Sequence, residues 1–231
     1  MRKLSVLHAL LTTGLLFAGS MTATAATIRV SQETSAGSGV FVQLGQIDAI
    51  AAVGQTVAQY YNLTSASYGG AFPAAVSNTT QSFFVSTSEG LAFFQLLDRT
   101  ADQTGGSAQM LFTVVNDTVS VFVSDDNGEV VATDGGATVT GTWGWAGCCT
   151  DGGAFGSLDG GAWRVFASFA DAPTGLGGGW RAVSADGSTL ALDTSTGRRV
   201  RFDLVPEPGT ITMFGFGLLG LAALRRRQAV R

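Results

Sequence analysis

The region between the two ends of this chain contains no histidine and no lysine. The single histidine, His8, and the only lysine, Lys3, both lie within the first 26 residues. A domain without histidine cannot use a Ser-His-Asp or Cys-His mechanism. Its two cysteines are adjacent, which gives too few ligands for a typical zinc site. No glycine-rich loop ends in Gly-Lys-Ser or Gly-Lys-Thr, so a phosphate-binding P-loop is absent as well.

Basic residues are also scarce in this region. Residues 27–204 contain 16 acidic residues and 7 arginines, which gives a net charge of −9. This balance argues against nucleic acid as a partner. Carboxylate-pair chemistry, as in glycoside hydrolases, stays open, but the spacing of the acidic residues selects no pair. We therefore expect a non-enzymatic domain with no catalytic residues, no metal site and no cofactor, apart from the calcium alternative given below.

The N-terminus has the layout of a secretory signal peptide. Arg2 and Lys3 precede an apolar core at residues 10–17, and a run of small residues follows. Cleavage after Ala25 and cleavage after Ala26 both place small side chains at the −3 and −1 positions, so both sites stay open. Residues 1–26 are thus predicted to direct export through the secretion machinery. The alternative, an uncleaved anchor, requires a longer apolar core of about 20 residues.

The C-terminus, residues 205–231, has three parts in a fixed order. A proline-rich motif comes first, then an uncharged apolar stretch at 211–224, and then an arginine cluster. The motif is Val205-Pro206-Glu207-Pro208-Gly209, and the cluster is Arg225-Arg226-Arg227. Basic residues stay on the cytoplasmic side of a membrane. The pattern therefore predicts a transmembrane helix at 211–224 with the body of the protein outside the inner membrane.

This tripartite end resembles the PEP-CTERM sorting signal of Gram-negative bacteria, with Pro206, Glu207 and Pro208 at the positions of its core. The resemblance implies an exosortase as partner, a membrane cysteine protease that cleaves near the motif. It also implies an inner-membrane precursor facing the periplasm, a final place at the cell surface or in the extracellular matrix of a biofilm, and exopolysaccharide as a candidate partner. A proline-rich linker before an ordinary anchor is the alternative. The resemblance covers only residues 205–231 and assigns nothing to the body.

Residues 27–204 predict one mainly β domain, an antiparallel sandwich, because short alternating apolar runs are separated by turn residues. Two-residue and four-residue turns at 116–117, 125–128 and 186–187 predict three hairpins. The run at 91–97 suits a strand or a helical turn equally. Residues 43–61 have apolar positions close to a helical period, which predicts one amphipathic helix, although Gly45 and Gly54 weigh against it.

Cys148 and Cys149 are the first candidate site in the body. Thiols tend to pair in the oxidising compartment to which the body is exported. Neighbouring cysteines close a disulfide only through a tight ring, outside the usual Cα separation. A vicinal disulfide that fixes the loop at 147–153, two free thiols and an intermolecular bridge are the three alternatives. A structural role is favoured over a redox role, because redox pairs are normally spaced as Cys-x-x-Cys.

Acidic loops and tryptophans supply the remaining candidates. Oxygen ligands for calcium are offered by Asp125, Asp126, Asn127 and Glu129, and by Asp151 and Asp159. EF-hand spacing is absent, and Asp-Asn-Gly also suits a turn, which is the favoured interpretation. The tryptophans, Trp143, Trp145, Trp163 and Trp180, fit either a platform for sugar rings or the core, and the core is favoured. A carbohydrate- or calcium-binding module is thus the first alternative function, and a carboxylate-based glycoside hydrolase the second.

Overall fold

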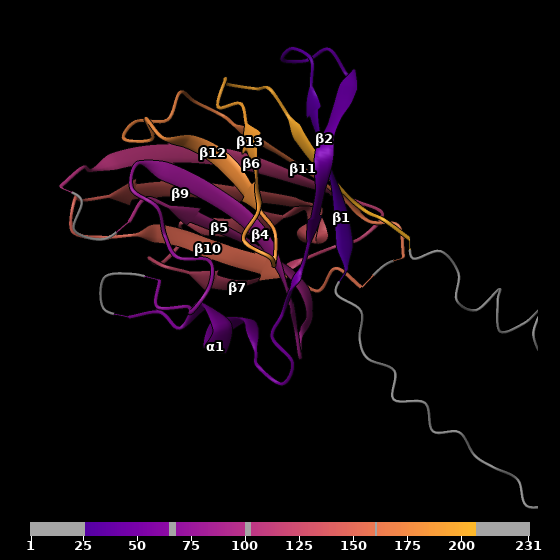
Figure 1. The fold of residues 1–231 in the computed structure, drawn as a ribbon, viewed down its shortest axis with the longest axis horizontal. Helices are drawn as coiled ribbons and strands as arrows, with labels where there is room; N and C mark the ends of the chain where they lie inside the picture. The colour runs from indigo at the N-terminus through magenta and orange to yellow at the C-terminus, as the bar shows by residue number, and fades with distance from the viewer. Residues whose placement is uncertain (1–25, 65–67, 100–102, 160, 207–231) are drawn as a thin grey trace, which may run out of the picture.

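The computed structural model describes residues 26–64, 68–99, 103–159 and 161–206 (Figure 1). They form two packed β-sheets, A and B, so the prediction of a mainly β sandwich is confirmed. Most of the predicted signal peptide, the sorting signal beyond Pro206 and the predicted transmembrane helix at 211–224 lie outside the described residues. Within the described ranges, no helix combines the length and apolar character that crossing a membrane requires.

Sheet A contains seven strands, and every pairing in it is antiparallel. In spatial order they are β2 (Phe41–Asp48), β1 (Thr27–Glu33), β14 (Val200–Leu204), β11 (Arg164–Phe169), β6 (Gly106–Val115), β9 (Thr138–Trp145) and β8 (Val130–Thr133). The last strand of the chain, β14, therefore lies inside the sheet, between β1 and β11.

Sheet B is built around two long, largely buried strands at its centre. In spatial order it contains β13 (Thr189–Leu192), β12 (Gly179–Val183), β4 (Thr79–Thr87), β5 (Gly90–Leu97), β10 (Asp151–Gly156) and β7 (Ser120–Ser124), while β3 (Ile50–Ala51) pairs with β4. The pairings of β4 with β12 and with β3 are parallel. Two short helices, α1 (Val57–Tyr61) and the 3-10 helix η1 (Asp134–Gly136), complete the described elements.

The main hydrophobic core lies between the two sheets. Alternate residues of β6 and β9 point inward, as the two-residue period of a strand requires, and bury Met110, Phe112, Val139 and Trp143. Phe93 of β5 lies among other aromatic rings, with ring centroids 5.0–5.5 Å away. These neighbours are Phe84, Phe112, Phe155 and Phe202. The two sheets are thus joined through one aromatic cluster.

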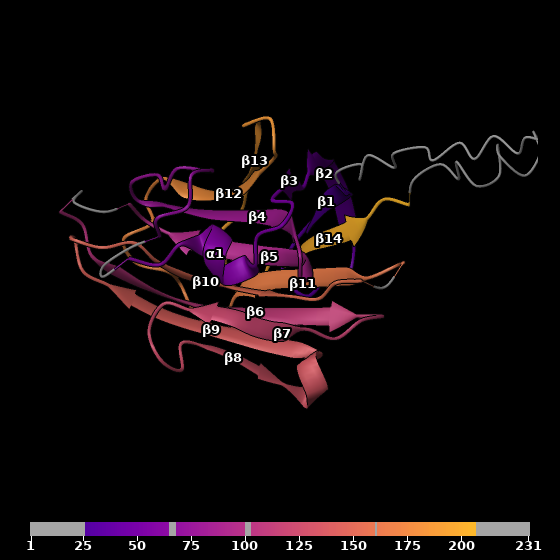
Figure 2. The same ribbon diagram turned by 90° about the horizontal axis from the view of Figure 1, so that it is seen from below.

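A second, smaller core covers the outer face of sheet B. Helix α1 lies over this face (Figure 2), where Val57 and Tyr61 pack with Phe83 and Phe94. Sheet B is therefore buried on both faces, and consecutive residues such as Phe83 and Phe84 point into different cores. This arrangement explains why residues 91–97, which lie in strand β5, are apolar except for Gln95.

The predicted helix at 43–61 is wrong except for its last turn. Residues 41–48 form β2, and only Val57–Tyr61 is helical, starting at a Thr56–Gln59 capping box. Gly54 has φ of 82°, in the left-handed region that interrupts a helix. Two of the apolar residues near a helical period are covered by sheet contacts instead: Ile47 is buried in the main core, and Ile50 is partly buried beside β4.

Two of the three predicted hairpins are also wrong, although their strands exist. Strands β6 and β7, joined at 116–117, belong to different sheets, and so do β7 and β8, joined at 125–128. These segments cross from one sheet to the other instead of folding back beside their predecessor. Turn residues are the same in both kinds of connection, so local composition does not separate them. The hairpin at 186–187 is confirmed, because β12 pairs with β13.

Candidate functional site

The two described ends of the chain lie side by side in sheet A. Strands β1 and β14 are antiparallel, with Ile28 opposite Leu204, and the Val205 N–H donates to the Thr27 carbonyl at 2.9 Å. The fold therefore releases the sorting segment at the same end at which the chain enters after the predicted cleavage sites. Of the predicted motif only Val205 and Pro206 are described. The other motif and cleavage positions lie outside the described residues: Ala25, Glu207, Pro208, Gly209, Arg225, Arg226 and Arg227.

Ala26, the second predicted cleavage position, is the first described residue. Its side chain packs against the main core, and its carbonyl accepts a hydrogen bond from the Ala49 N–H at 2.8 Å. The chain is therefore part of the fold from this residue onward.

An acidic pocket brings several candidate residues together. It lies where β9 ends and β10 begins, away from the place where the chain leaves sheet A. It has a volume of about 450 Å³. The loop after β7, the end of β9 and the start of β10 contribute most of its lining, including Asp125, Asp126, Trp145, Cys149 and Asp151. Residues from three of the candidate sets in the sequence thus meet in one place. The meeting depends on pairing of β10 with both β5 and β7, for which the sequence carries no local signal.

Asp151 is fixed at the base of this pocket. Its Oδ1 accepts from the Gly152 N–H at 2.7 Å, and its Oδ2 accepts from the Gly144 N–H at 3.1 Å. The side chain is buried, and burial together with the nearby Glu129 carboxylate raises the pKa of Asp151 from 3.8 to about 7. Burial and the neighbouring negative charge therefore favour the protonated form of this carboxyl relative to an exposed aspartate.

Asp125 is the second perturbed carboxyl of the pocket. The pKa of Asp125 is raised from 3.8 to about 6. Burial is the largest cause, and the negative charges of Glu129 and Asp126 add to it. No arginine is among the described residues that line the pocket. The pocket thus concentrates negative charge without a compensating cation among the described residues.

Tyr61 of α1 lies behind the pocket and was not among the residues singled out in the sequence. Its side chain is fully buried, and its hydroxyl has no hydrogen-bond partner among the described residues. Burial and the negative charges of Asp125 and Asp151 raise the pKa of Tyr61 well above 10. It is therefore a neutral phenol at physiological pH.

The calcium interpretation is only partly matched by this geometry. Asp125, Asp126 and Asp151 line the pocket, but Asp159 lies against Gly90, at the other end of β5. Within the described ranges, no three Asp, Glu, Cys or His side chains are placed to hold a metal ion. The loop instead closes as a turn, since the Asp126 N–H donates to Glu129 Oε2 at 3.0 Å. The residues present do not fit a preformed calcium site.

Cys148 and Cys149 are joined by a disulfide at the rim of the pocket, with their Cα atoms 3.7 Å apart. The Cys149 N–H donates to the Ala146 carbonyl at 3.0 Å. The bond and this turn together shape the connection between β9 and β10, from which Cys149 and Thr150 face the pocket.

All four tryptophans are buried, which confirms the favoured interpretation that they belong to the core, and the alternative of an exposed platform for sugar rings is wrong. None is more than 5% exposed. The Trp145 Nε1–H donates to Asp98 at 2.9 Å, and the Trp180 Nε1–H donates to Ser82 at 2.8 Å. The tryptophan side chains point from the sheets into the space between them and so fill the core.

Replacing Asp125 by asparagine is expected to stabilise the protein only at higher pH. A carboxyl whose pKa is raised on folding is most favourable when protonated, so stability is lost as the pH rises from 3.8 through about 6. The Asn variant lacks this loss, and its melting temperature should exceed that of the wild type by roughly 2–4 °C at about pH 8. Near pH 4 the two proteins should melt together. Asp171→Asn, at an exposed position, is the control, and an equal gain there would contradict the assignment.

Comparison with protein-family models shows that the C-terminus of this chain is typical of exported proteins that are sorted to the cell surface through a C-terminal signal. Residues 204–227 match the PEP-CTERM protein-sorting motif, which implies an exported protein that is processed by an exosortase. The match begins at Leu204, the last residue of β14. Comparisons with curated proteins and with solved structures gave no significant match, and the body stays unassigned.

Proposed function

We propose that the body is a non-enzymatic structural module of the cell surface or the extracellular matrix of a Gram-negative bacterium. The observation that carries the proposal is the position of the sorting motif, which begins where the central strand β14 ends. The whole sandwich is therefore the cargo that an exosortase releases or transfers. The absence of histidine from residues 27–204 supports a role without catalysis. In this role the precursor is held in the inner membrane by residues 211–224 until it is cut.

Replacing Pro206, Glu207 and Pro208 together by alanine is expected to block processing. The motif is the recognition element that the exosortase reads, so the variant should keep residues 211–224 and stay in the membrane fraction. Mass spectrometry of the protein from cells that contain an exosortase measures this directly. Pro173→Ala, in the loop between β11 and β12, should be processed like the wild type. Finding residues 211–224 on the mature wild-type protein would rule the proposal out.

Carbohydrate binding is the second candidate function, and the acidic pocket favours it. Asp125, Thr150 and Asp151 offer carboxyl and hydroxyl groups to a ligand rich in hydroxyls, in a cavity large enough for a small saccharide. A glycan array with the purified body tests this function. Binding that disappears in Asp151→Ala would support it, and an array without signal would remove it. Chromogenic glycosides screened on the same sample test the glycoside hydrolase alternative.

A further inference from the structure

Strand β2 forms the outer edge of sheet A (Figure 1). Among the described residues β2 pairs with no strand other than β1. At its C-terminal end the Asp48 N–H and C=O bond to Ser184 and Ala185, and the outward backbone groups of the rest of the strand have no strand partner. It has eight residues, whereas the other strands that end a sheet, β8, β13 and β7, have four or five. β2 is thus the longest edge that the described fold offers to another strand.

The side chains of β2 are unusually apolar for an edge. Val40, just before the strand, is 58% exposed, and Val42 and Leu44 within it are 54% and 40% exposed. No charged residue occurs from 34 to 47, in a body with a net charge of −9. Proteins normally protect a long edge with lysine, proline or a bulge. β2 contains neither lysine nor proline, and its pairing with β1 is interrupted by one bulge, at Leu44.

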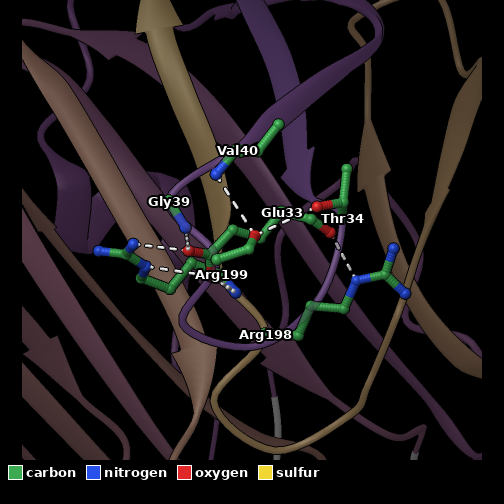
Figure 3. Close-up of polar contacts among 7 residues, drawn as sticks. Glu33, Thr34, Gly39, Val40, Arg198 and Arg199 are labelled. Atoms are coloured by element: carbon green, nitrogen blue, oxygen red, sulfur yellow. Dashed lines mark hydrogen bonds and ion pairs between the residues drawn. The ribbon is translucent and has the colours of Figure 1, made fainter.

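The hairpin that carries this edge is held in place by a buried carboxylate (Figure 3). Glu33 Oε1 accepts from the Gly39 N–H at 2.8 Å and from the Arg199 guanidinium at 2.6 Å. The Thr34 N–H donates to the Val40 carbonyl at 2.9 Å and closes the same loop. The edge is therefore ordered before any partner arrives, which lowers the entropy cost of binding.

We propose that β2 pairs with β2 of a second copy of this chain and joins two copies of sheet A into one continuous sheet. Symmetric pairing places identical uncharged segments opposite each other, so no like charges meet. Elsewhere the acidic bodies repel one another, which favours contact through this uncharged edge. Covering Val40, Val42 and Leu44 adds apolar burial to the backbone hydrogen bonds. A contact of one strand per copy is small, so the dimer is reversible and depends on concentration.

The test uses a protein comprising residues 26–206, which includes every described residue of both hydrophobic cores. Sedimentation velocity over a concentration series should show a monomer–dimer equilibrium. Val42→Lys should weaken the dimer at least tenfold, because it puts like charges on the facing strands. Val53→Lys is the matched control: Val53 is 85% exposed and outside β2, and the variant should dimerise like the wild type. Melting curves confirm that both variants fold.

Hydrogen exchange locates the interface. Amides at 41–48 should exchange more slowly in the dimer, while those of β8 and β13 should not change. A wild type that stays monomeric at high concentration would overturn the proposal, as would a dimer that protects β8 or β13 instead. Dimerisation of a protein comprising residues 26–231 but not of residues 26–206 would assign the contact to the C-terminal tail, and would overturn it too. None of these outcomes depends on sorting by the exosortase.

Discussion

Glu33→Gln is expected to lower the free energy of unfolding by about 2–3 kcal/mol at neutral pH, because it removes one partner of a buried ion pair. The Glu33 side chain is inaccessible to solvent, while that of Arg199 is 40% exposed and can regain water, which keeps the loss moderate. Besides the Arg199 guanidinium, the backbone N–H groups of Gly39 and Arg199 also donate hydrogen bonds to the carboxylate. Urea denaturation of the two proteins measures the difference.

The same substitution should change the response to acid. Hydrogen bonding to Arg199 is the largest cause that lowers the pKa of Glu33 from 4.5 to about 2. A carboxyl with a lowered pKa contributes stability that is fully present above 4.5 and is lost as the pH falls towards 2. The wild type should therefore lose its advantage over Glu33→Gln across this interval. Asp171→Asn, at an exposed position, should match the wild type throughout, and a constant gap between wild type and Glu33→Gln down to about pH 2 would contradict the assignment.

Phe93→Ala should have the largest effect of any single substitution considered, about 4 kcal/mol of unfolding free energy. Its ring is fully buried and contacts four other aromatic rings from both sheets, so truncation leaves a cavity between the layers. Removing it should loosen the packing of sheet A on sheet B. Chemical denaturation and near-UV circular dichroism measure the two consequences.

Leu111→Ala is the control for this prediction. Leu111 belongs to β6 but lies on the outer face of sheet A and is 43% exposed. Its truncation should cost well under about 1 kcal/mol, the usual limit for surface positions. Comparable losses in Phe93→Ala and Leu111→Ala would show that the aromatic cluster does not join the sheets.

Strands were predictable from the sequence, but their partners were not. Alternation at 138–143 and 163–169 reflects one buried face, which is a local property. Residues 111–115 and 118–123 look like a hairpin, yet the chain between them crosses to the other sheet, because partner choice depends on the closing of the whole sandwich. The helix at 43–61 failed for a related reason. Burial of Ile47 and Ile50 comes from distant strands, and a helical period matched it by coincidence.

For the candidate sites too, one part could be predicted from the sequence and the other could not. The sorting motif was readable because its signal is a contiguous run of residues, and the match at 204–227 confirms it. The pocket was not readable as a unit. Asp125 and Asp151 were singled out separately, and they meet only because β10 pairs with β7. Tyr61 had no signal at all, since an unpartnered buried hydroxyl is visible only in three dimensions.

The position of β14 inside sheet A determines when the sheet can be completed during export. Strand β1 leaves the secretion channel first, but its neighbour is the last strand of the body, so sheet A is complete only after nearly the whole polypeptide has been translocated. Contacts between such distant segments form slowly. Val205 precedes the predicted membrane segment by only five intervening residues, about 20 Å when extended. While the precursor is held by the predicted membrane segment, the final strand can pair with β1 only within that short reach of the bilayer.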